Sequence, residues 1–261
     1  MSVKKISLKI ILFCAIVSAW LSSCKKSTEN FIDAYPVASF FSLKIGDSAF
    51  FRMDSLEFTP SKQDPSLLNS YLIKEEVVSI ERDNLNQPMW KINRFINKDT
   101  TGNGVWRSNG YYFIQILNQQ VNFIENNLRY IRIKSPVRTN FSWKGNTALP
   151  TEAYPDYDFS IDNNMLNWNY FYKEVGGAEI IGYSKDIYDK TITVELIDQS
   201  TNVNDDNNSI ISSNNFASKE KWIEKFAQNV GLIYKEQILW EYQPVKQRRV
   251  GFLLKMWRIK K

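Results

Sequence analysis

Apolar and polar positions alternate at period two along most of this chain, in runs mostly of 6 to 12 residues bounded by turn residues. These runs predict strands at residues 49–56, 70–80, 89–96, 105–107, 111–117, 120–125, 128–134, 166–173, 191–197, 219–227, 231–242 and 248–259. Successive strands without helical runs between them favour antiparallel pairing over βαβ units. We therefore predict a mainly β fold, a curved antiparallel sheet or incomplete barrel with at most one short helix.

Three segments depart from this regular pattern. Residues 219–230 also fit one face of a helix, with apolar residues at i, i+1, i+4, i+5 and i+8, but their neighbours favour a strand. Residues 198–215 are rich in Asn and Asp and predict a long polar loop. Residues 135–165 contain several prolines and no clear period, which is typical of irregular structure.

The first 23 residues have the pattern of an export signal. Lys4, Lys5 and Lys9 precede an apolar run at 10–20, which is too short for the about 20 residues that span a bilayer. Leu21-Ser22-Ser23-Cys24 follows and resembles the bacterial lipobox, where cleavage precedes the cysteine and a diacylglycerol is attached to its thiol. We predict a signal peptide over 1–23, lipidation at Cys24, a tether over 24–39 and one antiparallel β domain over 40–261.

Cleavage at this site would remove most of the chemistry that the chain could use. It leaves 238 residues, lowers the formal charge from +5 to +2 and removes Cys14, while the lipid occupies the thiol of Cys24. The chain also has no histidine. Histidine and thiol catalysis and His or Cys metal sites are thereby excluded. We expect no catalytic residue, no cofactor and no metal site.

The predicted lipid also decides the compartment and the partners. Two or three acyl chains anchor a protein durably to a membrane, whereas one chain binds only marginally. Lys25 and Lys26 follow the cysteine where an inner-membrane lipoprotein commonly has aspartate, so the outer membrane is favoured, on either its periplasmic or its surface face. The expected partners are the membrane, through the lipid, and an envelope protein or glycan, but not nucleic acid.

Several phrases of the mature chain resemble a lipoprotein family of Bacteroidota. They are residues 41–48 (FSLKIGDS), 53–55 (MDS), 72–76 (LIKEE), 125–131 (ENNLRYI), 143–146 (WKGN) and 230–236 (VGLIYKE). The resemblance spans roughly residues 40 to 260, and it departs from the family where Ser42 replaces a usual proline. It implies one exported β-rich domain and no particular activity.

Aromatic residues are the candidate ligand-binding groups. Trp143 lies in the WKGN turn, and Trp168, Tyr170 and Tyr172 share one face of the predicted strand with Leu166. Such rings stack on sugars or apolar ligands, but large aromatic side chains more commonly fill a core.

Carboxylates are the remaining candidates for chemistry. Glu75 and Glu76 point to opposite faces of a strand, which favours a solvated face or a cross-strand ion pair over joint catalysis. Glu125 with Arg129, and Lys235 with Glu236, could each place a carboxylate beside a cation. Glu125 and Glu236 are therefore the pair to test for glycoside hydrolysis, which needs two carboxyl groups about 5 to 9.5 Å apart.

Two charged segments have simpler interpretations. Asp205-Asp206 offers oxygen ligands, but it lacks the EF-hand spacing, so a solvated loop is favoured over a calcium site. Residues 246–261 contain seven basic residues and no acid. They predict an edge strand protected by lysine, with attraction to anionic lipid head groups as the alternative.

The sequence thus favours a membrane-anchored envelope lipoprotein with a non-catalytic binding or structural role. A carrier that shelters an apolar ligand on a concave β face is the first alternative. A carboxylate-dependent glycan hydrolase is the second.

Overall fold

The computed structural model describes residues 34–58, 68–150, 165–204 and 209–260. The chain divides into two units, Met1–Ile32 and Asp33–Lys261, and all described residues belong to the second. Cys24, the predicted signal peptide and the Asp205-Asp206 loop lie outside the described residues, so their assignments stay predictions.

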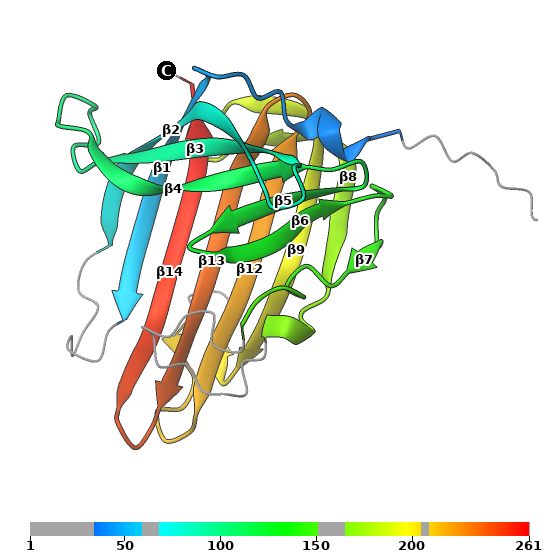
Figure 1. The fold of residues 1–261 in the computed structure, drawn as a ribbon. Helices are drawn as coiled ribbons and strands as arrows, with labels where there is room; N and C mark the ends of the chain where they lie inside the picture. The colour runs from blue at the N-terminus through cyan, green and yellow to red at the C-terminus, as the bar shows by residue number, and fades with distance from the viewer. Residues whose placement is uncertain (1–33, 59–67, 151–164, 205–208, 261) are drawn as a thin grey trace, which may run out of the picture. The chain divides into compact units, whose positions relative to one another are not determined.

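Antiparallel strands make up nearly all of the regular structure, which confirms the predicted fold class (Figure 1). The main sheet has the order β6-β5-β4-β3-β2-β1-β14-β13-β12-β9-β8-β7. Its strands are β1 (Ser48–Phe58), β2 (Asn69–Arg82), β3 (Pro88–Asn97), β4 (Arg107–Ile116), β5 (Gln120–Glu125), β6 (Leu128–Lys134), β7 (Ser142–Trp143), β8 (Tyr170–Ile180), β9 (Ile187–Thr201), β12 (Ala217–Ala227), β13 (Gly231–Gln243) and β14 (Arg248–Ile259). A separate pair consists of β10 (Val203–Asn204) and β11 (Ser209–Ile210).

Helical structure among the described residues is limited to short 3₁₀ turns, η1 (Val37–Phe40) and η3 (Met165–Asn167). Val37 and Phe40 are buried in the main core. Val37 lies in the segment predicted as a tether, so the packed body begins before residue 40.

The sheet curves until its two edge regions meet. The backbone N–H of Ile131 on β6 donates to the carbonyl of Gly145, just after β7, at 2.9 Å. The indole of Trp143 donates to the carbonyl of Ile131 at 2.7 Å, and the hydroxyl of Tyr172 donates to the carbonyl of Lys134 at 2.6 Å. These bonds satisfy edge groups without a continuous ladder, so the sheet is an almost closed barrel.

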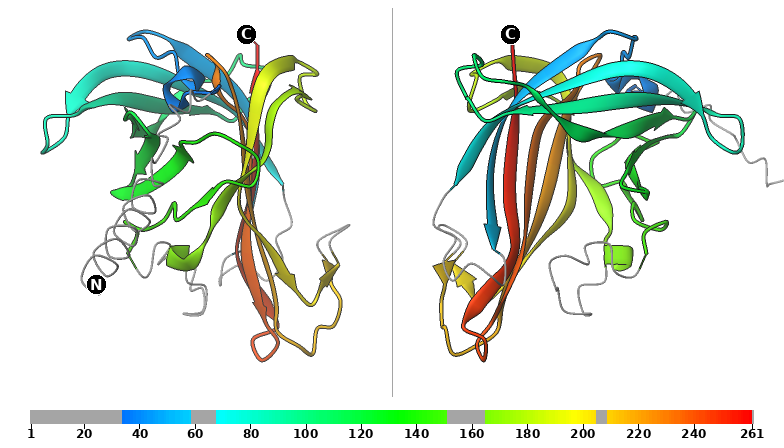
Figure 2. Two further views of the ribbon diagram at one scale, coloured as in Figure 1. Left: turned by 90° about the vertical axis from the view of Figure 1, so that its right-hand side faces the viewer. Right: turned by 60° about the vertical axis from the view of Figure 1, so that its left-hand side comes forward.

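The main core fills the space between the two arms of the sheet. In Figure 2 the cyan and green strands β2–β6 bend away from the long strands β9, β12, β13 and β14 at one end. The rings of Tyr130 on β6 and Trp222 on β12 approach to 5.9 Å between these arms. We call the side of the long strands that carries Trp222, Lys235 and Leu254 the inner face; residues directly opposite on neighbouring antiparallel strands share a face.

The structure confirms one ambiguous strand prediction and corrects the bounds of two others. Residues 219–227 form a strand, as favoured, because β12 pairs on both sides with β9 and β13. The predicted loop at 198–215 is wrong at its start, since β9 continues to Thr201 and pairs with β12. The predicted strand at 166–173 begins only at Tyr170, because residues 165–167 form a 3₁₀ turn; Trp168 therefore does not alternate with Tyr170 in a strand.

The C-terminal strand is central, not at an edge. β14 forms a hairpin with β13, as its loop length predicted, but it also pairs with β1 along nine residue pairs. This pairing joins segments about 200 residues apart, which local sequence cannot reveal. The predicted lysine-protected edge strand is therefore wrong, and lysine here has other partners: Lys255 pairs with Glu236 at 2.9 Å and Lys260 with Asp186 at 2.9 Å.

Candidate functional site

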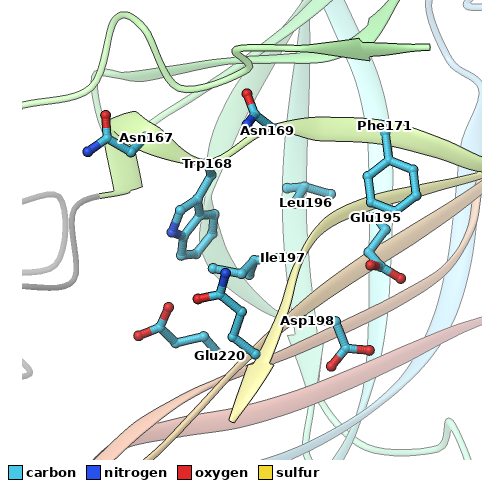
Figure 3. A pocket seen from close by; sticks show the side chains of 10 residues that line it. Asn167, Trp168, Asn169, Phe171, Glu195, Leu196, Ile197, Asp198 and Glu220 are labelled. Atoms are coloured by element: carbon cyan, nitrogen blue, oxygen red, sulfur yellow. The ribbon is translucent and has the colours of Figure 1, made fainter. Parts of the chain in front are cut away.

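Trp168 lies beside one of the pockets of the described residues. This pocket has a volume of about 410 Å³ and opens beside β9 where β8 begins (Figure 3). In Figure 3 the indole points toward Ile197, with the carboxylate of Glu220 to its left and that of Asp198 to its right. Its charged lining consists of carboxylates, and burial together with the nearby Glu241 raises the pKa of Glu220. The pocket therefore disfavours anions.

The indole of Trp168 is largely committed to packing. Only 6% of Trp168 is exposed, and its ring contacts Trp222 edge-on with centroids 6.2 Å apart. Little of the indole surface is therefore accessible to a ligand. The role of Trp168 as a stacking platform stays a prediction.

The other three aromatic candidates are buried where the sheet edges meet. The ring of Trp143 contacts those of Tyr170 and Tyr172, and the centroids of Trp143 and Tyr172 are 4.8 Å apart. The hydroxyl of Tyr170 donates to the buried side chain of Asn146, and burial raises the pKa of this phenol. None of the three lines the Trp168 pocket or the inner pocket described next. The ring contacts and hydrogen bonds of these three residues stabilise the region where the sheet edges meet.

A second pocket, the inner pocket, lies on the inner face and has a volume of about 270 Å³. It combines apolar and charged side chains from β1, β2, β3, β4, β6, β12, β13, β14 and the β5–β6 hairpin. The lining residues are Met53, Ile73, Arg94, Asn109, Glu125, Asn126, Leu128, Tyr130, Arg132, Trp222, Lys235, Gln237, Phe252, Leu254 and Met256.

Strand register separates the apolar and polar parts of the inner pocket. Met53 on β1 lies opposite Met256 on β14, which in turn lies opposite Lys235 on β13. In the next row Leu254 lies opposite Gln237. Because neighbouring strands are about 4.8 Å apart, the lining changes from thioether and alkyl groups to polar groups within one or two strands.

Arg132 and Lys235 form the polar end around the indole of Trp222. The guanidinium of Arg132 lies 4.4 Å from the Trp222 ring centre and 4.2 Å from that of Tyr130. The ammonium of Lys235 lies 5.0 Å from the same indole. Such cation–π contacts stabilise cations that have lost part of their water. Glu224 accepts a hydrogen bond from the Trp222 N–H at 3.0 Å and lies 3.5 Å from Arg132.

Arg94 organises the strands that cross over this end. Its guanidinium contacts Glu75 at 3.1 Å and Glu125 at 2.5 Å, and Tyr112 donates to Glu75 at 2.8 Å. Burial opposes the charged form of Arg94, but the carboxylates of Glu125 and Glu75 outweigh it and raise its pKa. Burial likewise opposes ionisation of Glu125, yet Arg94 and Lys235 keep its pKa below the usual value. Glu125 is thus held as a carboxylate.

Lys235 differs from these paired groups. Burial lowers its pKa, and although Glu224 and Glu125 favour its charge, Arg132 and Arg94 oppose it. Among the described residues no carboxylate lies within ion-pair distance of its ammonium, whereas Lys221 and Lys255 both reach Glu236. Lys235 is therefore the cation of the inner pocket that has no carboxylate in direct contact.

The carboxylate pairs expected from sequence are arranged differently. The expectation of a cross-strand ion pair is confirmed for Glu75, which lies opposite Arg94 on β3. The pairing of Glu125 with Arg129 is wrong, because Arg129 donates to Gln115. Lys235 and Glu236, as neighbours in a strand, point to opposite faces.

Glu236 therefore cannot act with Glu125. Glu236 binds Lys221 and Lys255 on the outer face, at 3.0 and 2.9 Å, whereas Glu125 lines the inner pocket. The structure does not bring together the two carboxylates that a hydrolase would need.

Arg94, Arg132 and Trp222 are site residues that the sequence analysis did not single out. A usable signal was present on β13, where Lys235 and Gln237 precede Leu239 at period two and place two polar side chains on one face of the strand. Arg132 gives a similar signal, since it lies two residues after Tyr130 and so shares a strand face with it; the structure shows it only 4% exposed.

Neither a metal cluster nor a membrane-crossing helix is found in the part of the chain that the structure describes. No group of three or more His, Cys, Asp or Glu side chains there could hold a metal ion. No helix there is long and apolar enough to cross a membrane.

Comparison with known proteins yields only distant structural likeness. The sequence matches no model of a protein family and no curated protein. A candidate exported protein with a YmcC-like fold from Bacteroides fragilis is 12% identical, with a TM-score of 0.36 over 85% of this chain and 99% of that one. A candidate lipoprotein from Parabacteroides distasonis is also 12% identical, with a TM-score of 0.29 over 84% and 96%. At these scores neither assigns a function to this chain.

Proposed function

We propose that this protein is a lipid-anchored binding protein of the bacterial envelope, without catalytic activity, that holds a small amphiphilic ligand in its inner pocket. The observation that carries this proposal is the pocket lining, in which apolar side chains on β1 and β14 adjoin the cations and aromatic rings on β6, β12 and β13. Ligand pockets commonly combine a mostly apolar wall with a few polar groups that fix orientation. A volume of about 270 Å³ favours a small molecule.

The charges around the pocket support binding over catalysis. Glu75 and Glu125 are both bound by Arg94, and Glu224 faces Arg132 and the Trp222 N–H. A general acid would need a carboxyl group with a raised pKa, whereas that of Glu125 is lowered. Glu75, Glu125 and Glu224 thus hold the cations of this end of the pocket in place.

Mass spectrometry of the protein from native membranes tests the anchor. We expect a mature N-terminus at Cys24 carrying a thioether-linked diacylglycerol, because the lipobox pattern directs cleavage before this residue. A Cys24→Ser variant should keep its leader and lose the lipid mass. An unmodified Cys24, or an intact leader on the wild-type protein, would contradict the proposed anchoring, and fractionation on a density gradient would show which membrane holds it.

Calorimetric titration with 1-octanol tests the pocket. We expect saturable binding that Leu254→Glu weakens at least tenfold, because a carboxylate at the apolar end resists desolvation. Val245→Glu is the matched control, since Val245 is 96% exposed in the β13–β14 turn. Circular dichroism establishes that each variant is folded, and Met53→Glu replaces Leu254→Glu if that variant unfolds. Failure of both 1-octanol and octanoate to bind would overturn the proposed function.

A further inference from the structure

We infer that the ligand of the inner pocket is an anionic amphiphile, a carboxylate with an aliphatic chain in its simplest form, whose anion binds Lys235 beside Arg132. This inference rests on the proposed function and specifies its ligand class. The aliphatic part would lie over Leu254, Met256 and Met53.

The charged lining of the pocket favours an anion. The residues that line it include the cations Arg94, Arg132 and Lys235, but Glu125 is their one acidic counterpart in the lining. Arg94 already binds Glu125 and Glu75, and Arg132 faces Glu224. Lys235 is left facing the pocket with an aromatic ring beside it and no carboxylate in direct contact.

The spacing of the two ends fits an amphiphile. Lys235 lies directly across from Met256, and Leu254 lies one row further along, opposite Gln237. An anion at Lys235 thus places its first carbons over β14, where the side chains are apolar. A ligand that carried several hydroxyl groups, such as a sugar, would leave these hydroxyls against Leu254 and Met256 without hydrogen-bond partners.

Protonation of Lys235 is coupled to the charges that surround it. These are Arg94 on β3, Glu125 on β5, Arg132 on β6 and Glu224 on β12, with Glu75 and Tyr112 behind Arg94. Burial lowers the pKa of Lys235, and a bound anion would raise it again by favouring the ammonium. Binding at a pH where Lys235 has lost part of its proton should therefore take up protons, and calorimetry in buffers of different ionisation enthalpy measures this uptake.

A matched series of eight-carbon probes tests the inference. We expect octanoate to bind at least tenfold more tightly than 1-octanol, because a charge-assisted hydrogen bond is about twice as strong as a neutral one. Octylamine should bind more weakly than either, because its ammonium would lie beside Lys235 and Arg132. Lys235→Met should weaken octanoate binding at least tenfold and bring its affinity close to that of 1-octanol, whose neutral hydroxyl depends less on the ammonium. Lys221→Met is the control, since Lys221 binds Glu236 on the outer face.

The outcomes separate this inference from the proposed function. If 1-octanol binds and Leu254→Glu prevents it, but octanoate gains nothing or Lys235→Met leaves octanoate unchanged, the anion inference is overturned and the binding function stands. If no probe of the series binds, both fall. Should Lys235→Met not fold, Lys235→Gln takes its place, because it removes the charge and keeps a polar end.

Discussion

Replacement of Gly251 by alanine is expected to destabilise the protein by about 3 kcal/mol, the combined scale of backbone strain and overpacking. Gly251 lies on β14 opposite Trp240 and has φ +124°, a conformation that side chains with Cβ rarely adopt. An added Cβ would lie 2.7 Å from the Cα of Trp240 and closer still to the carbonyl oxygen of Leu239. These are backbone atoms of the central hairpin, so they cannot move aside by changing a rotamer. Urea unfolding should measure the loss, and the melting temperature should fall by roughly 10 °C.

Gly177→Ala is the matched control for Gly251→Ala. Gly177 also lies in a strand, β8, but no heavy atom lies within 4 Å of the position its Cβ would take, and its φ is not in the positive range. We expect a change within about 0.5 kcal/mol, since surface substitutions without strain are nearly neutral. A Gly251→Ala variant as stable as Gly177→Ala would show that the β13–β14 hairpin can relax around the methyl group.

Strand positions could be predicted where turn residues mark the ends of alternating runs. The β5–β6 hairpin is an example, because Asn126 and Asn127 adopt φ +51° and +62°, as a two-residue type I′ turn requires. Asn229 has φ +60° between β12 and β13. Asparagine tolerates this conformation better than most residues, so it is a usable turn signal between strands.

Polar strand ends could not be predicted, because their partners are distant in sequence. The last residues of β9 are polar, yet Asp198 lies opposite Lys221 and Thr201 opposite Ser218 on β12. Backbone hydrogen bonds to β12 hold these residues in the sheet despite their low strand propensity. Similarly, β14 was predicted at an edge of the sheet but is central, because β1, from the other end of the chain, pairs with it.

The same limit applies to the inner pocket. Lys235, Gln237 and Leu239 follow one another at period two, so the sequence shows two polar side chains and one apolar side chain on the same face of β13. Its neighbours Arg94 and Arg132 come from β3 and β6, which cross over the long strands only because the whole sheet curves. The curvature and the register of the sheet therefore decide which cations meet in the pocket. Local sequence patterns reveal neither of them.

The buried cation Arg132 provides the second large expected effect. Arg132→Met should destabilise the protein by about 3–5 kcal/mol, as removal of one partner from a buried ion pair does, because Glu224 loses the cation that lies 3.5 Å from it. Arg132 and Glu224 are each only 4% exposed at their side chains, and the indole of Trp222 then remains as the hydrogen-bond donor to Glu224. Urea unfolding of the variant gives the free energy directly.

Two further variants decide whether this loss comes from the stranded carboxylate. The double variant Arg132→Met, Glu224→Gln should recover most of the stability, since a neutral amide is far less costly to bury than a carboxylate. Lys173→Met removes the cation of the Lys173–Glu195 pair, whose lysine side chain is 50% exposed, and should cost less than about 1 kcal/mol. If Arg132→Met costs no more than Lys173→Met, the Arg132–Glu224 pair does not stabilise the inner face, and this prediction is wrong.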